Sequence, residues 1–154
     1  MDYSQFFGRD AEKVARDLVG RLLVKTTGRE VTTGRILETG AYEGDKGTSS
    51  REGMLYAPGA IFLMSYRGTH LFNIATGQIG EPSCVEIRKV AIGTRSIKGS
   101  GKIANLFGIT PDLDGILIGE VRELQILGDW VGSSELRRRS GQAGNCLGYF
   151  SVKE

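Results

Sequence analysis

Residues 35–45 read RILETGAYEGD and join a strand to a loop. The segment 35–39 has the character of a strand that leads toward a site, and Ala41 and Tyr42 form an aromatic edge beside it. Gly40 stands between them, where a strand that serves a site would carry a functional side chain. Because glycine has no side chain and accepts tight turns, Gly40 is either a turn residue or the gap left by a catalytic group.

The composition limits the fold. The chain has 154 residues, 40% of them hydrophobic, which is enough for the core of one domain. The 23 glycines against 3 prolines indicate many turns and strands that approach one another closely. We therefore expect a single α+β domain over residues 1–154, built on a curved, mainly antiparallel β-sheet with few flanking helices.

The charged residues, the cysteines and the apolar runs limit the possible partners and the cellular location of the protein. The net charge is +2, and 13 of the 20 basic residues are arginine, which suits bidentate contact with phosphate. Cys84 and Cys146 lie far apart without C-x-x-C spacing, so neither a zinc site nor a secreted disulfide framework is indicated. We expect no metal and no cofactor. The sequence has no leader-like apolar region and no apolar run of membrane-spanning length. These features predict a soluble intracellular protein, cytoplasmic in a prokaryote or nuclear in a eukaryote, with no membrane partner.

Hydrophobic spacing predicts two helices and several strands. Asp10 can cap a helix whose apolar positions recur at helical spacing (Ala11, Val14, Ala15 and Leu18), with Gly20 as its C-terminal stop. A brief helix is expected over 102–107. Apolar runs bounded by turn residues predict strands over 22–25, 30–38, 60–66, 70–76, 84–92, 116–118 and 124–127, with a polar loop over 42–58.

Three further motifs carry weaker signals. GSGK at 99–102 lacks the first glycine and the Ser/Thr of a nucleotide P-loop, since Ser96 and Ile103 occupy those positions. This helix start could hold a DNA phosphate, although an ordinary helix start is the simpler interpretation. His70 is the only histidine and is interpreted as a strand residue. The run RRR at 137–139 is either a solvated face or a set of phosphate contacts.

Four segments are informative together: RILETGAY, APGAIFLMSYRGTHLFNIAT, SCVEIRKVAIG and GSGKIANLFGI. Their order and approximate spacing resemble those of the alkyladenine (3-methyladenine) DNA glycosylase family, with patterns such as RIVETEAY, PG-x-x-Y-V-Y-x-x-YGM-x-x-C-x-N, V-L-I-R-A and GPGKL. The likeness covers about residues 14–109, and the tail from Gly141 matches only faintly. It implies a monofunctional base-excision-repair enzyme whose partner is double-stranded DNA containing damaged purines, and we expect a monomer.

The resemblance also assigns site residues. Flipping a base out of duplex DNA costs a few kcal/mol, so such a protein needs a wedge for the vacated space and a pocket for the base. The family's DNA-intercalating wedge tyrosine corresponds to Tyr66, and its stacking tyrosine corresponds to Tyr42. The asparagine that helps to reject guanine-type bases corresponds to Asn73, and the pocket arginine corresponds to Arg88. Three of these residues also have a purely structural interpretation. Tyr66 could pack in the core or at its rim, Asn73 could bond a neighbouring turn, and Arg88 could form a surface salt bridge.

The catalytic acid is the main departure from the family pattern. Hydrolysis of a glycosidic bond through an oxocarbenium-like transition state needs a carboxylate that orients and deprotonates water. The family supplies it from the second glutamate of E-T-E-A-Y, where this chain has Gly40. The pocket histidine of the following loop is also missing, and the family's second strand tyrosine corresponds to Leu63.

Glu38 is the nearest candidate to replace the missing acid. Strand alternation puts Glu38 on the same face as Tyr42, about 7 Å from the vacant position at Gly40. An ion pair with Arg35 or Arg88 is the alternative role for Glu38. The choice between these roles depends on the tertiary structure.

Two functions remain open from the sequence. The first is a DNA glycosylase that hydrolyses the N-glycosidic bond of alkylated or deaminated purines, with Glu38, or Glu43 or Asp45 of the following loop, positioning the water. The second is a catalytically impaired, glycosylase-derived module that binds damaged or distorted DNA without excising the base. A domain whose partner is not DNA is a third interpretation, which the salt dependence of binding would expose.

Overall fold

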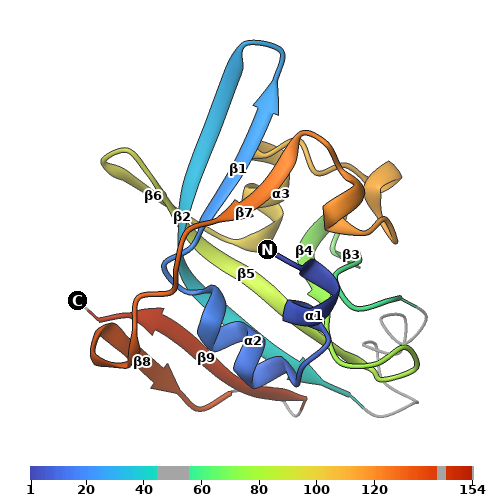
Figure 1. Cartoon of the computed structure of the whole chain (residues 1–154), viewed down its shortest axis with the longest axis vertical. Helices are drawn as coiled ribbons and strands as arrows, with labels where there is room; N and C mark the ends of the chain where they lie inside the picture. The colour runs from blue at the N-terminus through green and yellow to red at the C-terminus, as the bar shows by residue number, and fades with distance from the viewer. Residues whose placement is uncertain (45–55, 142–144, 154) are drawn as a thin grey trace.

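The computed structural model describes residues 1–44, 56–141 and 145–153, and an open β-sheet lies at its centre (Figure 1). Its strands are β1 (Leu22–Thr27), β2 (Glu30–Glu43), β3 (Ile61–Tyr66), β4 (Thr69–Ala75), β5 (Ser83–Ile92), β6 (Arg95–Lys98), β7 (Leu124–Leu127), β8 (Leu136–Arg139) and β9 (Cys146–Val152). The strand order is β3-β4-β5-β2-β1-β7, with β6 on β5, β9 on β2 and β8 on β9. Each of these pairings within the described part of the chain is antiparallel.

Three α-helices flank this sheet in the described ranges: α1 (Tyr3–Phe7), α2 (Ala11–Leu18) and α3 (Ser100–Leu106). The Asp10 side chain accepts a hydrogen bond from the Lys13 amide and so caps α2, as expected from the sequence. In Figure 1, α2 lies across β9 and β2. The Thr39 hydroxyl donates to the Ala15 carbonyl at 2.7 Å, so α2 covers the face of β2 opposite to that of Gly40.

The central strand β2 organises the sheet because it has different neighbours along its 14 residues. Its first part pairs with β1, whereas residues 38–42 lie between β5 and β9. The register with β5 shifts on both sides of Glu38, which marks a β-bulge. Beyond this bulge, Gly40 pairs with Glu86 on β5 and with Tyr149 on β9. Because it pairs on both sides, β2 continues through Tyr42, whereas the sequence predicted that a loop begins at this residue.

The apolar core lies between the sheet and the helices. Its largest fully buried side chains are Phe7, Phe62, Phe72, Phe107, Leu18, Leu23, Ile36, Ile61, Ile74, Ile87, Ile103 and Ile118. Each such side chain contributes about 1.5–3 kcal/mol when it is removed from water. Polar residues on the other face of β2 are therefore free to form a site without weakening this core.

The expected fold class is confirmed: the protein is an α+β protein with a mainly antiparallel sheet. The strand predicted over 116–118 is wrong. Leu117 makes only an isolated bridge with Ala60, and a 3₁₀ turn follows at Ile118–Glu120. Gly115, with φ +84°, forms a turn just before this segment, and the 3₁₀ turn just after Leu117 ends the extended backbone before a ladder can form. The sequence also did not predict α1, β6, β8 and β9.

Three 3₁₀ turns complete the elements of the described residues: Pro111–Leu113, Ile118–Glu120 and Ser133–Glu135. None of the helices that the structure describes is long and apolar enough to cross a membrane.

Candidate functional site

A row of five residues in cross-strand register crosses the sheet on the face opposite α2. Its members, from β4 through β5, β2 and β9 to β8, are Asn73, Glu86, Gly40, Tyr149 and Arg139. Residues directly opposite on neighbouring strands have Cβ atoms about 4.5–5.5 Å apart. The row therefore places an amide, a carboxylate, a bare glycine, an aromatic ring and a guanidinium side by side.

A pocket of about 420 Å³ opens over one end of this row. It is lined by Tyr42, Met64, Tyr66, Leu71, Asn73, Cys84, Glu86, Arg88 and Asn145. The four residues expected from the sequence to bind a base or intercalate in DNA, Tyr42, Asn73, Arg88 and Tyr66, thus line one cavity. They come from β2, β4, β5 and β3, so only the folded sheet brings them together.

Tyr66 lies at the rim of the pocket, at the end of β3. Arg67 and Gly68 form a two-residue turn with φ of +49° and +78°, and Tyr66 pairs with Thr69 across it. Tyr66 is 51% exposed, and the Arg67 guanidinium lies 5.2 Å from the centroid of its ring. Tyr66 is therefore an aromatic side chain presented to solvent at a hairpin tip, and packing in the core does not explain it.

Arg88 connects the polar groups below the pocket. Its Nε donates to Glu38 at 2.9 Å, and one terminal nitrogen donates to Glu86 at 3.1 Å and to the Tyr42 hydroxyl at 3.2 Å. Its guanidinium also lies 4.1 Å from the centroid of the Tyr149 ring. Burial alone would lower the pKa of Arg88, but the hydrogen bond to Glu38 and the charge of Glu86 raise it above its ordinary value.

Glu38 lies below the pocket and does not line it. The residue is only 8% exposed, and its two carboxylate oxygens accept from Arg88 and, at 3.1 Å, from Arg139. The ion pair with Arg88 is the alternative that the sequence left open for this residue. Glu38 lines a separate groove of about 450 Å³ together with Leu37, Lys89, Lys98, Arg137, Arg139, Ser151, Val152 and Lys153.

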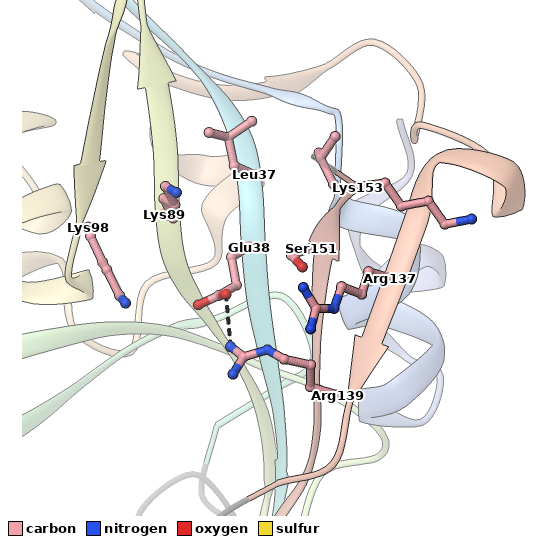
Figure 2. Close-up of a pocket in the computed structure, with 9 residues that line it drawn as sticks. Leu37, Glu38, Lys89, Lys98, Arg137, Arg139, Ser151 and Lys153 are labelled. Carbon is pink, nitrogen blue, oxygen red and sulfur yellow. Dashed lines mark hydrogen bonds and ion pairs between the residues drawn. The ribbon is translucent and has the colours of Figure 1, made fainter.

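This groove is basic and crosses the sheet. Figure 2 shows Arg139 reaching Glu38 from β8, with the guanidinium of Arg137 beside Ser151. The residues Lys98, Lys89, Glu38, Ser151 and Arg137 are in cross-strand register from β6 to β8. Because Glu38 is already paired with two arginines, the remaining cations keep the groove positive.

Glu86 is the residue of the site that the sequence did not single out. Its Oε1 accepts from the Tyr42 hydroxyl at 3.1 Å and from Arg88, and its Oε2 accepts from the Ser100 hydroxyl at 2.6 Å. Burial and the charge of Glu86 raise the pKa of Tyr42 above its ordinary value, so this phenol stays protonated and donates. One signal was present: in VEIRK, Glu86 replaces the leucine of the family pattern V-L-I-R-A.

Gly40 lies inside β2 and is not a turn residue. A Cβ atom at this position would lie 3.0 Å from Cε2 of Tyr42, 3.2 Å from Cδ of Arg88 and 3.3 Å from Cδ1 of Tyr149. These distances are shorter than ordinary van der Waals contact, so the neighbours would have to move. The stem of Arg88 and two tyrosine rings thus occupy the space that a larger side chain would use.

The remaining candidates have different surroundings. Leu63 is buried in the core, and its neighbour Met64 lines the pocket. Asn73 donates to the Leu71 carbonyl at 3.2 Å and accepts from the Cys84 thiol at 3.6 Å. Burial, with a smaller effect of the nearby Glu86 charge, raises the pKa of Cys84 to about 12, so this thiol stays protonated.

The candidates outside the pocket are placed as follows. Glu43 lines a groove beside α2, Asp45 lies outside the described residues, and His70 lies on β4 as expected. The described residues contain no group of three His, Cys, Asp or Glu side chains that could hold a metal ion.

The chain is similar to a class of DNA repair proteins. A relative from Anaeromyxobacter sp. (strain Fw109-5) is 32% identical over 123 residues, which cover 71% of this chain and 63% of the relative. A relative from Lactobacillus johnsonii is 30% identical over 136 residues, covering 71% and 65%, and one from Natranaerobius thermophilus is 33% identical over 143 residues, covering 75% and 72%. Each is named "Putative 3-methyladenine DNA glycosylase".

The family itself is shown by a match over most of the chain. Residues 5–140 match the methylpurine-DNA glycosylase family, and the chain belongs to this family. The resemblance seen in the sequence is thereby confirmed. The chain spans less than two thirds of the length of the first two relatives, 63% and 65%.

Proposed function

We propose that the protein is a DNA glycosylase that takes an alkylated or deaminated purine, flipped out of double-stranded DNA, into the pocket over Glu86 and hydrolyses its N-glycosidic bond. The observation that carries this proposal is the shared cavity of Tyr42, Asn73, Arg88 and Tyr66. Its volume of about 420 Å³ lies within the range of small-molecule sites, about 300–1,000 Å³.

The walls of the pocket suit a purine. Tyr42 offers an aromatic face, Asn73 an amide, and Arg88 a cation, so stacking and hydrogen bonds to the base edge are both available. Tyr66 at the hairpin tip fills the role of the wedge, because its exposed ring can replace the stacking that the extruded base gives up. Flipping a base out of the duplex costs least for a damaged base, which favours the capture of damaged bases over normal ones.

A second observation supports DNA as the partner. An intermediate cavity of about 410 Å³ lies between the pocket and the basic groove, since it shares Tyr66, Leu71, Glu86 and Arg88 with the pocket and Lys98 with the groove. Lysine and arginine side chains along such a path can each neutralise a phosphate and release its counterions. We expect the DNA backbone to follow this path from Lys102 toward Arg137.

The binding module without catalysis is the second candidate, and the surroundings of Gly40 favour it. The space for a side chain at Gly40 is occupied by Arg88 and Tyr149, and both oxygens of Glu38 are held by arginines. Neither Gly40 nor Glu38 therefore offers a free carboxylate to a water molecule in the pocket. Excision then requires an acid from another strand.

Single-turnover excision distinguishes the two functions. Duplexes with a single 7-methylguanine, ethenoadenine or hypoxanthine are incubated with excess protein, and released base and abasic sites are measured. Anisotropy binding of the same duplexes and of an abasic-site analogue is measured at several salt concentrations. We expect base release and an affinity that falls steeply with salt. Normal binding without release would favour the binding module, and an affinity independent of salt would argue against DNA altogether.

A further inference from the structure

We infer that Glu86 is the catalytic carboxylate of this protein, acting from β5 at the place where β2 carries Gly40. This inference rests on the proposed function, because it names the residue that would activate water for excision. Glu86 is the one carboxylate among the described residues that line the pocket. It pairs directly with Gly40 across the two strands, so its side chain lies beside this glycine on the same face of the sheet.

The position of Glu86 between two cavities matches the place of a sugar. On one side lies the pocket of Tyr42 and Asn73, and on the other lies the intermediate cavity with Lys98 and Lys102. In a nucleotide, the sugar connects the base to the phosphate. A base in the pocket and a phosphate near the lysines would therefore bring the sugar C1′ next to Glu86.

The hydrogen bonds of Glu86 orient its carboxylate and leave one acceptor site. A carboxylate has about four lone-pair sites. Tyr42 and Arg88 occupy two of them on Oε1, whereas Ser100 occupies one on Oε2. The remaining site on Oε2 can accept a proton from water. Because the Glu86 side chain is 12% exposed, that water comes from the cavity and not from the open surface.

The chemical step can be written with this single carboxylate. The bond between C1′ and the base nitrogen breaks, and its electron pair goes to the base. The water oxygen forms the new bond to C1′ while Glu86 takes one water proton and later returns it to solvent. A cationic alkylated purine leaves as a neutral base and needs no further proton, whereas hypoxanthine or ethenoadenine leaves as an anion and takes one proton from solvent water. The negative charge of Glu86 also stabilises the positive charge that develops on the sugar.

Glu38 has a different part in this arrangement. It lies in the basic groove, and its ion pairs with Arg88 and Arg139 position these two cations. Through Arg88 it supports Glu86, since the same guanidinium bridges both carboxylates. Glu38 is thus a positioning residue, and Glu86 is the group that would touch water.

The test compares Glu86→Gln and Glu86→Ala with the wild-type protein in the single-turnover assay. Glu86→Gln keeps the shape of the side chain and should lower the excision rate constant at least about 100-fold, as for loss of a general base. Its affinity for a duplex with an abasic-site analogue should stay within threefold. Added formate should restore excision to Glu86→Ala at least tenfold, because a small carboxylate can enter the vacated space.

The controls separate this inference from the proposed function. Glu30 is exposed and lies roughly 30 Å along β2 from Gly40, so the control variant Glu30→Gln should leave the excision rate unchanged. If the wild-type protein binds DNA but releases no base, excision fails and the inference fails with it. If wild type excises and Glu86→Gln excises within threefold of it, the function stands and the inference is overturned. Equal losses of binding and excision, or no rescue by formate, would also overturn it.

Discussion

Replacing Arg88 by methionine tests the polar network that holds the site. Methionine keeps an aliphatic stem over the Tyr149 ring but removes the charge. The change breaks the ion pairs to Glu38 at 2.9 Å and Glu86 at 3.1 Å and the hydrogen bond to Tyr42 at 3.2 Å. Glu38 keeps Arg139 as a partner, whereas Glu86 keeps only neutral hydroxyl donors.

The expected loss of stability follows from these contacts. Removing one partner of a buried ion pair costs about 3–5 kcal/mol, because the other charge stays buried. The Arg88 side chain is 25% exposed and both carboxylates keep other donors, so we expect the low end, about 3 kcal/mol. With a urea m-value of about 2 kcal/mol/M, the midpoint of unfolding should fall by about 1.5 M.

Urea unfolding, followed by fluorescence of the single tryptophan, Trp130, measures this change. Arg139→Met is the matched control, because Arg139 also forms an ion pair with Glu38 but its side chain is 40% exposed. Exposed pairs contribute about 0–1 kcal/mol, so its midpoint should fall by less than about 0.5 M. Adding Glu86→Gln to Arg88→Met should recover part of the loss, since it removes the unpaired charge. Equal midpoints for the two arginine variants, or no recovery in the double variant, would refute this reasoning.

Two further changes test other parts of the molecule. Tyr66→Ala should weaken binding of lesion-containing duplexes by about 10- to 100-fold, the value of one base-aromatic stacking contact, without changing the urea midpoint. Tyr66→Phe should bind like wild type, and a drop in stability for Tyr66→Ala would show a packing role instead. Burial alone would raise the pKa of Asp17, but hydrogen bonds and charges from Arg16 and Arg9 lower it below its ordinary value of 3.8. Its stabilising effect is therefore present above that value and is lost as the pH falls through the lower pKa of the folded state. Asp17→Asn should lower stability at pH 7 and flatten the decline below about pH 4 in urea titrations; an unchanged decline would contradict this assignment.

Much of the fold could be predicted from local patterns. The helix that begins after Asp10 was predicted, because its apolar spacing and its Asp10 cap are properties of one short segment. The strands β8 and β9 were not predicted. Their pattern differs: Leu136–Arg139 consists mostly of arginine, and it becomes a strand only by pairing with β9. β9 in turn pairs with β2, more than 100 residues earlier in the chain, and no local pattern reveals such a partner.

The candidate site shows the same division. Tyr42, Asn73, Arg88 and Tyr66 could be selected from family-like motifs, and they line one pocket. Glu86 could not be selected by periodicity, because a glutamate in the middle of a strand is most simply a solvent-facing residue. Its importance depends on the register between β5 and β2.

The stretch RILETGAYEGD by itself determined that Glu38, Gly40 and Tyr42 share one face of a strand, because alternation is a property of the extended backbone. It also showed that no carboxylate stands at Gly40. Only the tertiary structure decided which acid lies next to that gap. A bulge beside Glu38 sets the pairing of β2 with β5 and puts Glu86 opposite Gly40. Register between strands separated by more than 40 residues depends on packing across the whole sheet, and so the sequence alone did not specify it.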